Sequence, residues 1–203
     1  MRKAIFIVLC LLVACKPGNK RSIRPPRPED RKAVLLQPLG KIPQTLISML
    51  RDSVQAYLPV TITIAKPLEL PDFAYYKPRN RYKADSLLTF LKTKHIGGIA
   101  FVAGITSKDI STKKGTINDY GIMGLGFEPG NECIVSLWRL NKDNPSQYLL
   151  QQRLLKTVVH ELCHNFGLPH CANRHCVMAD AEGRLNQDNE TGLCAACRKK
   201  LGI

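Results

Sequence analysis

Acidic residues are scarce in this sequence: Asp and Glu number 16 against 30 Lys and Arg, which gives a formal net charge of +14. Two motifs that mark common enzyme classes are also missing. There is no Gly-x-Ser-x-Gly sequence, which argues against a serine nucleophile of that type. The spacing of Gly121, Gly124 and Gly126 fits neither phosphate-binding fingerprint, so a pliable edge strand is the better interpretation. No internal repeat is visible, and 203 residues are most simply explained by one main domain.

A long hydrophobic run is absent as well, except near the N-terminus. Met1-Arg2-Lys3 is short and basic, and the apolar run over residues 4–13 is too short to span a bilayer comfortably. The run ends in Leu12-Val13-Ala14-Cys15, which resembles the lipobox of bacterial lipoproteins. That resemblance implies cleavage before Cys15, acylation of its thiol, and a lipid anchor in a membrane of the bacterial cell envelope. An ordinary secretory signal with a stray cysteine, or a short hydrophobic anchor, would explain the same residues.

The segment after the lipobox suits such a location. Residues 16–32 are basic, contain four prolines and one glycine, and show no apolar periodicity, as in an extended tether. We therefore expect a signal peptide over 1–14, a lipidated cysteine and tether over 15–33, and a folded domain over 34–203, facing the periplasm or the outside. The positive charge favours anionic lipid or acidic polymers as partners. Alternatively, the lysine and arginine side chains are simply solvated on the surface. The export signal argues against nucleic acid as a partner.

Hydrophobic periodicity predicts a mixed α/β domain. Helices are expected over residues 44–57, 82–93 and 144–166. Strands are expected over 60–64, 98–105, 121–127 and 133–140, with a turn at 128–131 and loops over 66–79 and 107–119. The order helix, strand, helix, strand favours parallel pairing within a small sheet.

The last of these helices should begin with Asn144 as its N-cap, Pro145 at its first position and Gln147 completing a capping box. Five apolar side chains fall on one stripe of this helix and should be buried under the sheet: Tyr148, Leu155, Val159, Leu162 and Phe166. Four polar side chains fall on the opposite side and should face a cleft: Arg153, Thr157, His160 and His164.

The residues 160–170 have the spacing His-Glu-x-x-His-x-x-Gly-x-x-His. His160 and His164 project from one helix face about one turn apart, and Gly167 can end the helix and bring His170 to a third ligand position. Three protein ligands leave one position open, which is the pattern of a catalytic zinc. Glu161 lies beside His164 without being a ligand, so its carboxylate is suited to act as a general base.

This spacing resembles the extended zinc motif of the metzincin metallopeptidases, with Met178 eight residues after His170 where the Met-turn of that clan would pass. Within the clan, the cysteine pattern resembles the archaemetzincin (archaelysin) family. The resemblance implies the three histidines as zinc ligands, Glu161 as general base and Met178 as support. It also implies a second, structural zinc bound by four cysteines: Cys171, Cys176, Cys194 and Cys197. Two departures are that fifteen residues separate Met178 from Cys194, slightly fewer than expected, and that no tyrosine follows Met178, which leaves the oxyanion partner unassigned.

The four cysteines also indicate zinc by their own spacing, because Cys194 and Cys197 form a C-x-x-C knuckle that is common in closed tetrahedral sites. Such a site would staple the C-terminal segment to the loop that carries His170. Disulfides are the competing interpretation, since an exported protein meets an oxidising compartment and Cys133 and Cys163 are also present.

Together these features predict a metzincin-like α/β fold: a small mixed twisted sheet, an active-site helix and a zinc-stapled, cysteine-rich C-terminal segment. The expected activity is hydrolysis of a peptide or protein by Glu161-assisted attack of zinc-bound water, with two Zn²⁺ ions in a monomer anchored by lipid to the membrane. The alternative is a non-catalytic zinc-binding envelope lipoprotein, a metal carrier or scaffold. Glu161 distinguishes the peptidase from the carrier, because a metal carrier has no evident need for a carboxylate at that position.

Overall fold

The computed structural model describes residues 31–127 and 130–203. The predicted signal peptide, Cys15 and all but the last three residues of the predicted tether lie outside the described residues. The first element of the described residues is strand β1, which starts at Lys32, two residues before the predicted start of the folded domain. Among the helices in the described part of the chain, none is long and apolar enough to cross a membrane.

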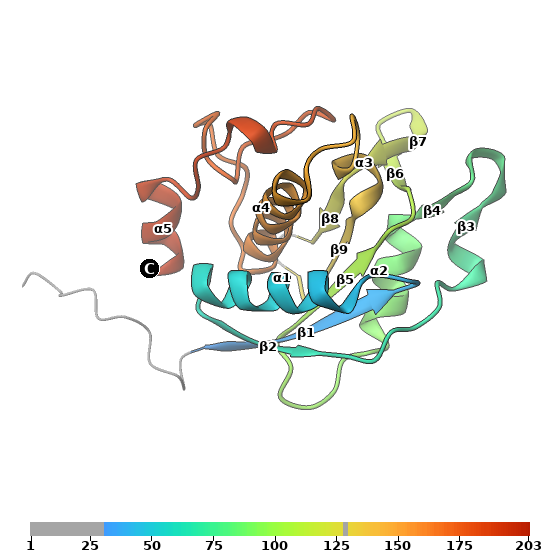
Figure 1. The fold of residues 1–203 in the computed structure, drawn as a ribbon, viewed down its shortest axis with the longest axis horizontal. Coiled ribbons are helices and arrows are strands. Elements are labelled where there is room, and N and C mark those ends of the chain that lie inside the picture. The colour runs from blue at the N-terminus through green and yellow to red at the C-terminus, as the bar shows by residue number, and fades with distance from the viewer. Residues whose placement is uncertain (1–30, 128–129) are drawn as a thin grey trace, which may run out of the picture.

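Five strands form the main sheet, in the spatial order β2-β1-β5-β9-β8 (Figure 1). The first four are parallel, and only the edge strand β8 runs antiparallel to its neighbour. Their bounds are β1 Lys32–Leu39, β2 Val60–Ile64, β5 Phe101–Thr106, β8 Gly124–Gly126 and β9 Glu132–Ser136. The predicted parallel pairing is thus present, but β1 lies between the two strands that the sequence singled out.

Helices cover both faces of this sheet, which explains why its inner strands carry apolar side chains on both faces. Helices α1 (Gln44–Tyr57) and α4 (Gln147–Asn165) pack on one face, and α2 (Ala84–Lys92) packs on the other. The strands alternate accordingly: Val34 of β1 belongs to the core under α1 and α4, whereas the next residue, Leu35, belongs to the core under α2.

A second, smaller sheet extends from the main one and has the order β3-β4-β6-β7. Its strands are β3 Tyr75–Tyr76, β4 Arg81–Lys83, β6 Ile110–Lys114 and β7 Ile117–Ile122. The prediction of a loop over 107–119 was therefore wrong. The polar composition of β6 and β7 reflects a hairpin with partly exposed faces, and the hairpin turns at Gly115, whose φ is +58°.

Two helix starts also differ from the predictions. The predicted strand over 133–140 ends at Ser136, whose hydroxyl accepts a hydrogen bond from the Trp138 backbone and caps the short helix α3 (Leu137–Leu140). Helix α4 is capped by Ser146, whose hydroxyl accepts from Leu149 N at 3.2 Å. Asn144 instead lies in the turn before the helix with φ +48°, a conformation that asparagine tolerates better than most residues.

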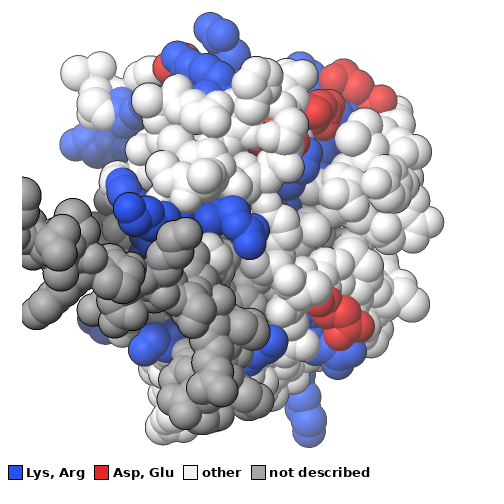
Figure 2. Space-filling view, turned by 90° about the vertical axis from the view of Figure 1, so that its left-hand side faces the viewer, with Lys and Arg blue, Asp and Glu red and all other residues white. Residues whose placement is uncertain are grey.

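The C-terminal segment folds back beside α4 and ends in helix α5 (Ala195–Leu201). Short 3₁₀ turns lie at Asp72–Ala74 (η2), Lys77–Arg79 (η3) and Gln187–Asn189 (η4). The face of the molecule on the side of α5 shows more Lys and Arg than Asp and Glu (Figure 2). The positive charge of the sequence is thus carried, on this face, by solvated surface side chains.

Candidate metal centres

Helix α4 carries the first part of the candidate site and is buried on more sides than predicted. It contacts α1, β8, β9 and η4, so polar side chains such as Arg153 and Thr157 are buried together with apolar ones. Tyr148 was predicted to be buried but is 70% exposed, and all residues in the first turn of the helix are at least partly exposed. Cys163 is fully buried, as the sequence predicted, and burial raises the pKa of its thiol to about 12.

The histidines of α4 are oriented by backbone carbonyls. His160 Nδ1 donates to Val177 O at 2.6 Å, and His164 Nδ1 donates to Leu168 O at 2.8 Å. The two Nε2 atoms lie 3.0 Å apart. Holding Nδ1 in this way fixes the tautomer in which Nε2 has its lone pair available, as in most histidine ligands of metals. Burial also lowers the pKa of His160 to about 4, so its imidazole is neutral near pH 7.

The end of the helix brings the third histidine to the other two. Gly167 has φ +85°, and its N–H and that of Leu168 bond back to His164 O and Cys163 O, a glycine-terminated helix end. The chain then turns back, and the His170 ring lies 5.3 Å from the His160 ring and 4.8 Å from the His164 ring. One ligand atom from each of the three histidines falls in a group no wider than 4.8 Å.

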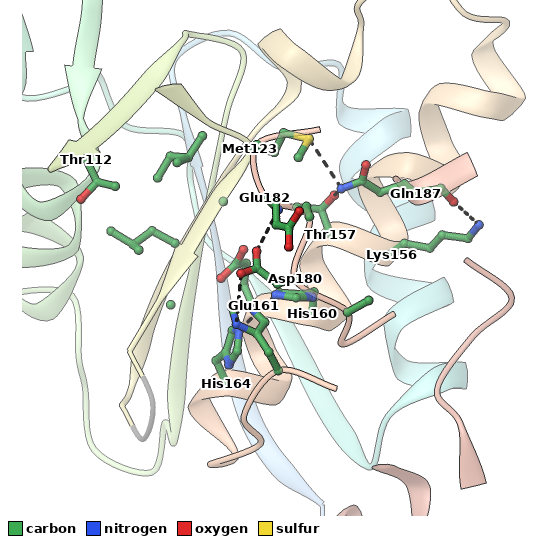
Figure 3. A pocket seen from close by; sticks show the side chains of 18 of the residues that line it. Thr112, Met123, Lys156, Thr157, His160, Glu161, His164, Asp180, Glu182 and Gln187 are labelled. Atoms are coloured by element: carbon green, nitrogen blue, oxygen red, sulfur yellow. Dashed lines mark hydrogen bonds and ion pairs between the residues drawn. The ribbon is translucent and has the colours of Figure 1, made fainter. Parts of the chain in front are cut away.

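These positions fit a zinc ion. Two nitrogens at about 2.0–2.1 Å from a tetrahedral zinc lie roughly 3.3 Å apart, close to the separation of the two Nε2 atoms. Glu161 is not part of the three-histidine group, although it lines the same cleft of about 410 Å³ (Figure 3). The arrangement therefore has three candidate ligands of one type and a carboxylate beside them.

The glycines of strand β8 leave room for the side chain of Glu161. A Cβ on Gly124 would overlap the Glu161 carboxylate, and one on Gly126 would come within 2.9 Å of the Glu161 backbone oxygen. Both positions therefore need glycine for α4 to pack this closely on the edge strand. Burial raises the pKa of Glu161 to about 8, while a hydrogen bond from the Gly126 backbone acts in the opposite direction. The predicted edge-strand interpretation of these glycines agrees with the structure.

Met178 lies in the segment that returns under the histidines. It is fully buried in the main core, its backbone oxygen accepts from Cys171 N at 2.7 Å, and its neighbour Val177 holds His160. The side of the cleft opposite β8 is formed by the residues that follow Met178. There, Asp180 lies 4.0 Å from His170, an ion pair if the histidine is protonated.

The four cysteines of the C-terminal segment form a second group. Cys171 Sγ lies 3.8 Å from Cys194 Sγ, and Cys176 Sγ lies 3.7 Å from Cys197 Sγ. Thiolates at about 2.3 Å from a tetrahedral zinc are roughly 3.8 Å apart, whereas the sulfurs of a disulfide are about 2.05 Å apart. All six cysteines in the described part of the chain are free thiols. The spacing therefore fits four ligands around one metal ion.

Several residues around the cleft were not anticipated from the sequence. The β6–β7 hairpin contributes Tyr120, whose hydroxyl donates to Glu182 O at 3.2 Å across the cleft. Lys156, Gln187 and Glu190 line one end of the cleft. Lys156 lies four residues before His160 and thus on the same helix face, a signal that the sequence contained. Nothing in the sequence connected the other residues to the motif, because they are brought there by the fold.

Two further histidines have structural partners. His95 Nε2 lies 3.1 Å from the carboxylate of Glu132, and His175 Nδ1 lies 3.2 Å from Asn189 O. Neither belongs to a metal-ligating group among residues 31–127 and 130–203. His175 is exposed, as the sequence analysis assumed.

Sequence comparison identifies relatives over most of the chain. The model of Peptidase family M54 matches residues 43–202. The archaemetzincin of Methanopyrus kandleri is 33% identical over 165 residues, which cover 80% of this chain and 90% of that protein. The archaemetzincin of Pyrococcus furiosus is 30% identical over 183 residues, which cover 84% of this chain and 93% of that protein.

Structure comparison agrees. The crystal structure of the Methanopyrus kandleri archaemetzincin matches with a TM-score of 0.71 and 31% identity, over 84% of this chain and 93% of that one. The archaemetzincin structure from Archaeoglobus fulgidus, complexed with malonate, has the same fold, with a TM-score of 0.69, 24% identity and coverage of 83% and 99%. The predicted α/β fold and the predicted family are confirmed. The chain belongs to peptidase family M54 and is a zinc metallopeptidase.

Proposed function

We propose that this protein hydrolyses peptide bonds with Glu161 as general base and then general acid. The observation that carries the proposal is the position of Glu161, whose carboxylate lines the histidine cleft without joining the ligand group. Zinc held by the three histidines would supply a Lewis acid that polarises the peptide carbonyl and makes a water molecule more acidic. The positive charge of that zinc would oppose the effect of burial on the pKa of Glu161 and favour its ionised form. The carboxylate then accepts the proton of the attacking water and passes it to the leaving amine. The hydrogen bonds from His160 and His164 to backbone carbonyls keep the ligand rings in place.

We also propose that the protein holds two zinc ions, one at the histidines and one at the four cysteines. The sulfur separations support the second ion. It would act as a structural ion, because four thiolates leave no open position. Metal analysis combined with thiol counting tests this: two zinc ions per chain are expected, whereas one zinc with few free thiols would favour disulfides.

The location is a separate proposal that rests on Leu12-Val13-Ala14-Cys15. We expect cleavage before Cys15, lipid on its thiol, and attachment to a membrane of the bacterial cell envelope. Metabolic labelling with palmitate should label the full chain and leave a Cys15→Ala variant unlabelled. Equal labelling of the two would contradict the assignment of Cys15.

Glu161→Gln tests the role of the carboxylate, because it removes the base and keeps nearly the same volume. We expect unchanged zinc content and a loss of peptide cleavage of about 10²- to 10⁴-fold, the usual range for general acid–base catalysis. Cleavage should be followed with a peptide library read by mass spectrometry, with and without a chelator. Unchanged hydrolysis in the variant would refute the mechanism. A wild-type protein that binds zinc but cleaves no peptide would instead favour the metal-carrier alternative.

A further inference from the structure

The cleft continues beyond the histidines into a recess beside the preceding turn of α4. Figure 3 shows Met123, Thr157 and Gln187 at one end of the cleft and His164 at the other. Five side chains line this recess. Met123 lies just before β8, Lys156 and Thr157 belong to α4, and Gln187 and Glu190 lie in and directly after η4. The chemistry proposed for Glu161 uses none of them.

Glu190 is the most unusual of these residues. It is only 7% exposed, and within the described part of the chain no group hydrogen-bonds or ion-pairs with its carboxylate. Burial raises the pKa of this carboxyl to about 7; Lys156 lowers it and Asp188 raises it further. Neither of its carboxylate oxygens is among the fully enclosed atoms without a partner, so the carboxylate reaches the cleft. A carboxylate of such low exposure normally pairs with a cation or a donor. The partner of Glu190 is therefore expected to enter from the cleft.

Gln187 presents a second acceptor without a partner. It is 5% exposed, and its Nε2 donates to Thr157 Oγ1 at 3.3 Å and contacts Met123 Sδ at 3.5 Å. Thr157 donates its own proton to Arg153 O, so its oxygen accepts from Gln187, which fixes the orientation of the amide. Gln187 Oε1 is then buried with no hydrogen-bond partner among residues 31–127 and 130–203. Two acceptors thus line one recess.

Lys156 is the only cation of the recess among the described lining residues, and its ammonium is already bound. It donates to Gln187 O at 2.5 Å and to Glu190 O at 2.7 Å, both of them backbone oxygens. These bonds tie the segment around η4 to α4 and hold both acceptors beside the helix. Lys156 therefore fixes the recess and leaves the Glu190 carboxylate unpaired.

We propose that this recess binds a lysine or arginine side chain of the peptide substrate, next to the bond that is cleaved. Glu190 and Gln187 Oε1 accept hydrogen bonds from its cationic group, and Met123 contacts its apolar stem. This inference rests on the proposed peptidase function. A basic side chain fits better than a neutral amide because it supplies several donors, and no acceptor, to two acceptors of which one is a carboxylate.

The test compares peptides that differ at one position. The zinc-loaded protein is first given a position-scanning peptide library, and cleavage sites are read by mass spectrometry; Lys and Arg should be enriched at one fixed position beside the cleaved bond. A fluorogenic peptide with Lys at that position should then have a kcat/KM about 10- to 100-fold above that of its norleucine counterpart, the range expected for a charged hydrogen bond.

Glu190→Gln should bring this Lys-to-norleucine ratio close to one, and Gln187→Leu should lower it several-fold. Glu69→Gln is the matched control, because it makes the same chemical change on an exposed carboxylate outside the catalytic cleft and should keep the ratio. Thermal unfolding of each variant shows whether it is folded.

Binding of the same two peptides to Glu161→Gln, measured by fluorescence anisotropy, separates the recess from the chemistry. Tighter binding of the Lys peptide that disappears when Glu190→Gln is added supports the recess even if no peptide is cleaved. Cleavage without any preference for Lys or Arg would overturn the inference and leave the proposed function intact. Equal binding of both peptides by a protein that cleaves neither would overturn both.

Discussion

Gly124→Ala should inactivate the enzyme without unfolding it or removing its zinc. The added Cβ would overlap a carboxylate oxygen of Glu161 and lie 2.8 Å from its Cγ and Cδ, whereas ordinary contacts of this kind begin near 3.4 Å. The Glu161 side chain must therefore move by roughly 0.6 Å at these two carbons and by more at the oxygen, which is the closest atom. Glu161 is the flexible partner of this contact, so the carboxylate and not the backbone should give way.

A displacement of about 1 Å at a catalytic group can lower the rate about 10²-fold, so we expect kcat to fall by roughly 30- to 100-fold. Zinc content should stay the same, because His160 and His164 are held by Val177 and Leu168, whereas the three atoms nearest the new methyl group all belong to Glu161. Stability should change little, since replacing glycine by alanine in a strand offsets part of the strain by about 0.4–1 kcal/mol.

The assay is kcat on a reporter peptide, with zinc measured by mass spectrometry and unfolding followed by calorimetry. Gly97→Ala is the matched control, because a Cβ there would meet nothing within 4 Å. Activity within about threefold of wild type would show that Glu161 needs no fixed position, contrary to the requirement for near-attack geometry. Loss of zinc in step with activity would show that the strand supports the ligands and not the base.

Three further outcomes follow from the same structure. Cys176→Ser should lose the zinc proposed at the cysteines and weaken zinc binding at the histidines by about 10- to 100-fold, the usual effect of changing a group that supports a metal ligand. The control variant Cys163→Ala should keep both zinc ions, as measured by metal analysis. Arg153→Met should lower the free energy of unfolding by about 3 kcal/mol in a denaturant titration, because it removes a buried cation bonded to Asp188 and to two carbonyls; the exposed Arg51→Met should change nothing measurable. Arg153 lowers the pKa of Asp188, so its contribution to stability should be present above the ordinary pKa of an aspartate and be lost as the pH falls below it. A difference between wild type and Arg153→Met that grows toward acid pH would contradict this assignment.

The helices and the buried strands were predictable because their periodicity follows directly from burial. Helix α1 has the predicted bounds, since its apolar residues lie on one face and Pro59 prevents its continuation. Strand β1 was missed. The folded domain was expected from residue 34, but the apolar run of β1 is only a few residues long, follows the proline-rich basic segment and contains Pro38, so no local signal identified it as a strand. Its central place in the sheet comes from pairing with β2 and β5, which no local pattern reveals.

The candidate site shows the same division. The order of His160, Glu161, His164 and His170 could be interpreted because consecutive turns of one helix and one glycine-ended turn bring them together. The opposite wall of the cleft could not be predicted from the sequence. Tyr120 and Glu190 are far apart in sequence, and they reach the cleft through the β6–β7 hairpin and the segment around η4. In our proposal the substrate is selected by that wall, so the motif predicts the chemistry of the site and not its preference.

The two candidate metal centres are joined by more than the adjacent residues His170 and Cys171. Val177 follows Cys176; its N–H donates to Gly192 O at 2.9 Å, and its carbonyl accepts from His160 Nδ1 at 2.6 Å. Cys194 lies two residues after Gly192, so a metal ion that holds Cys176 and Cys194 together also fixes the bridge between residues 176 and 192. The carbonyl that orients His160 is then set by the cysteine centre. A short C-terminal segment can thus stabilise the catalytic ligands without adding a large core of its own.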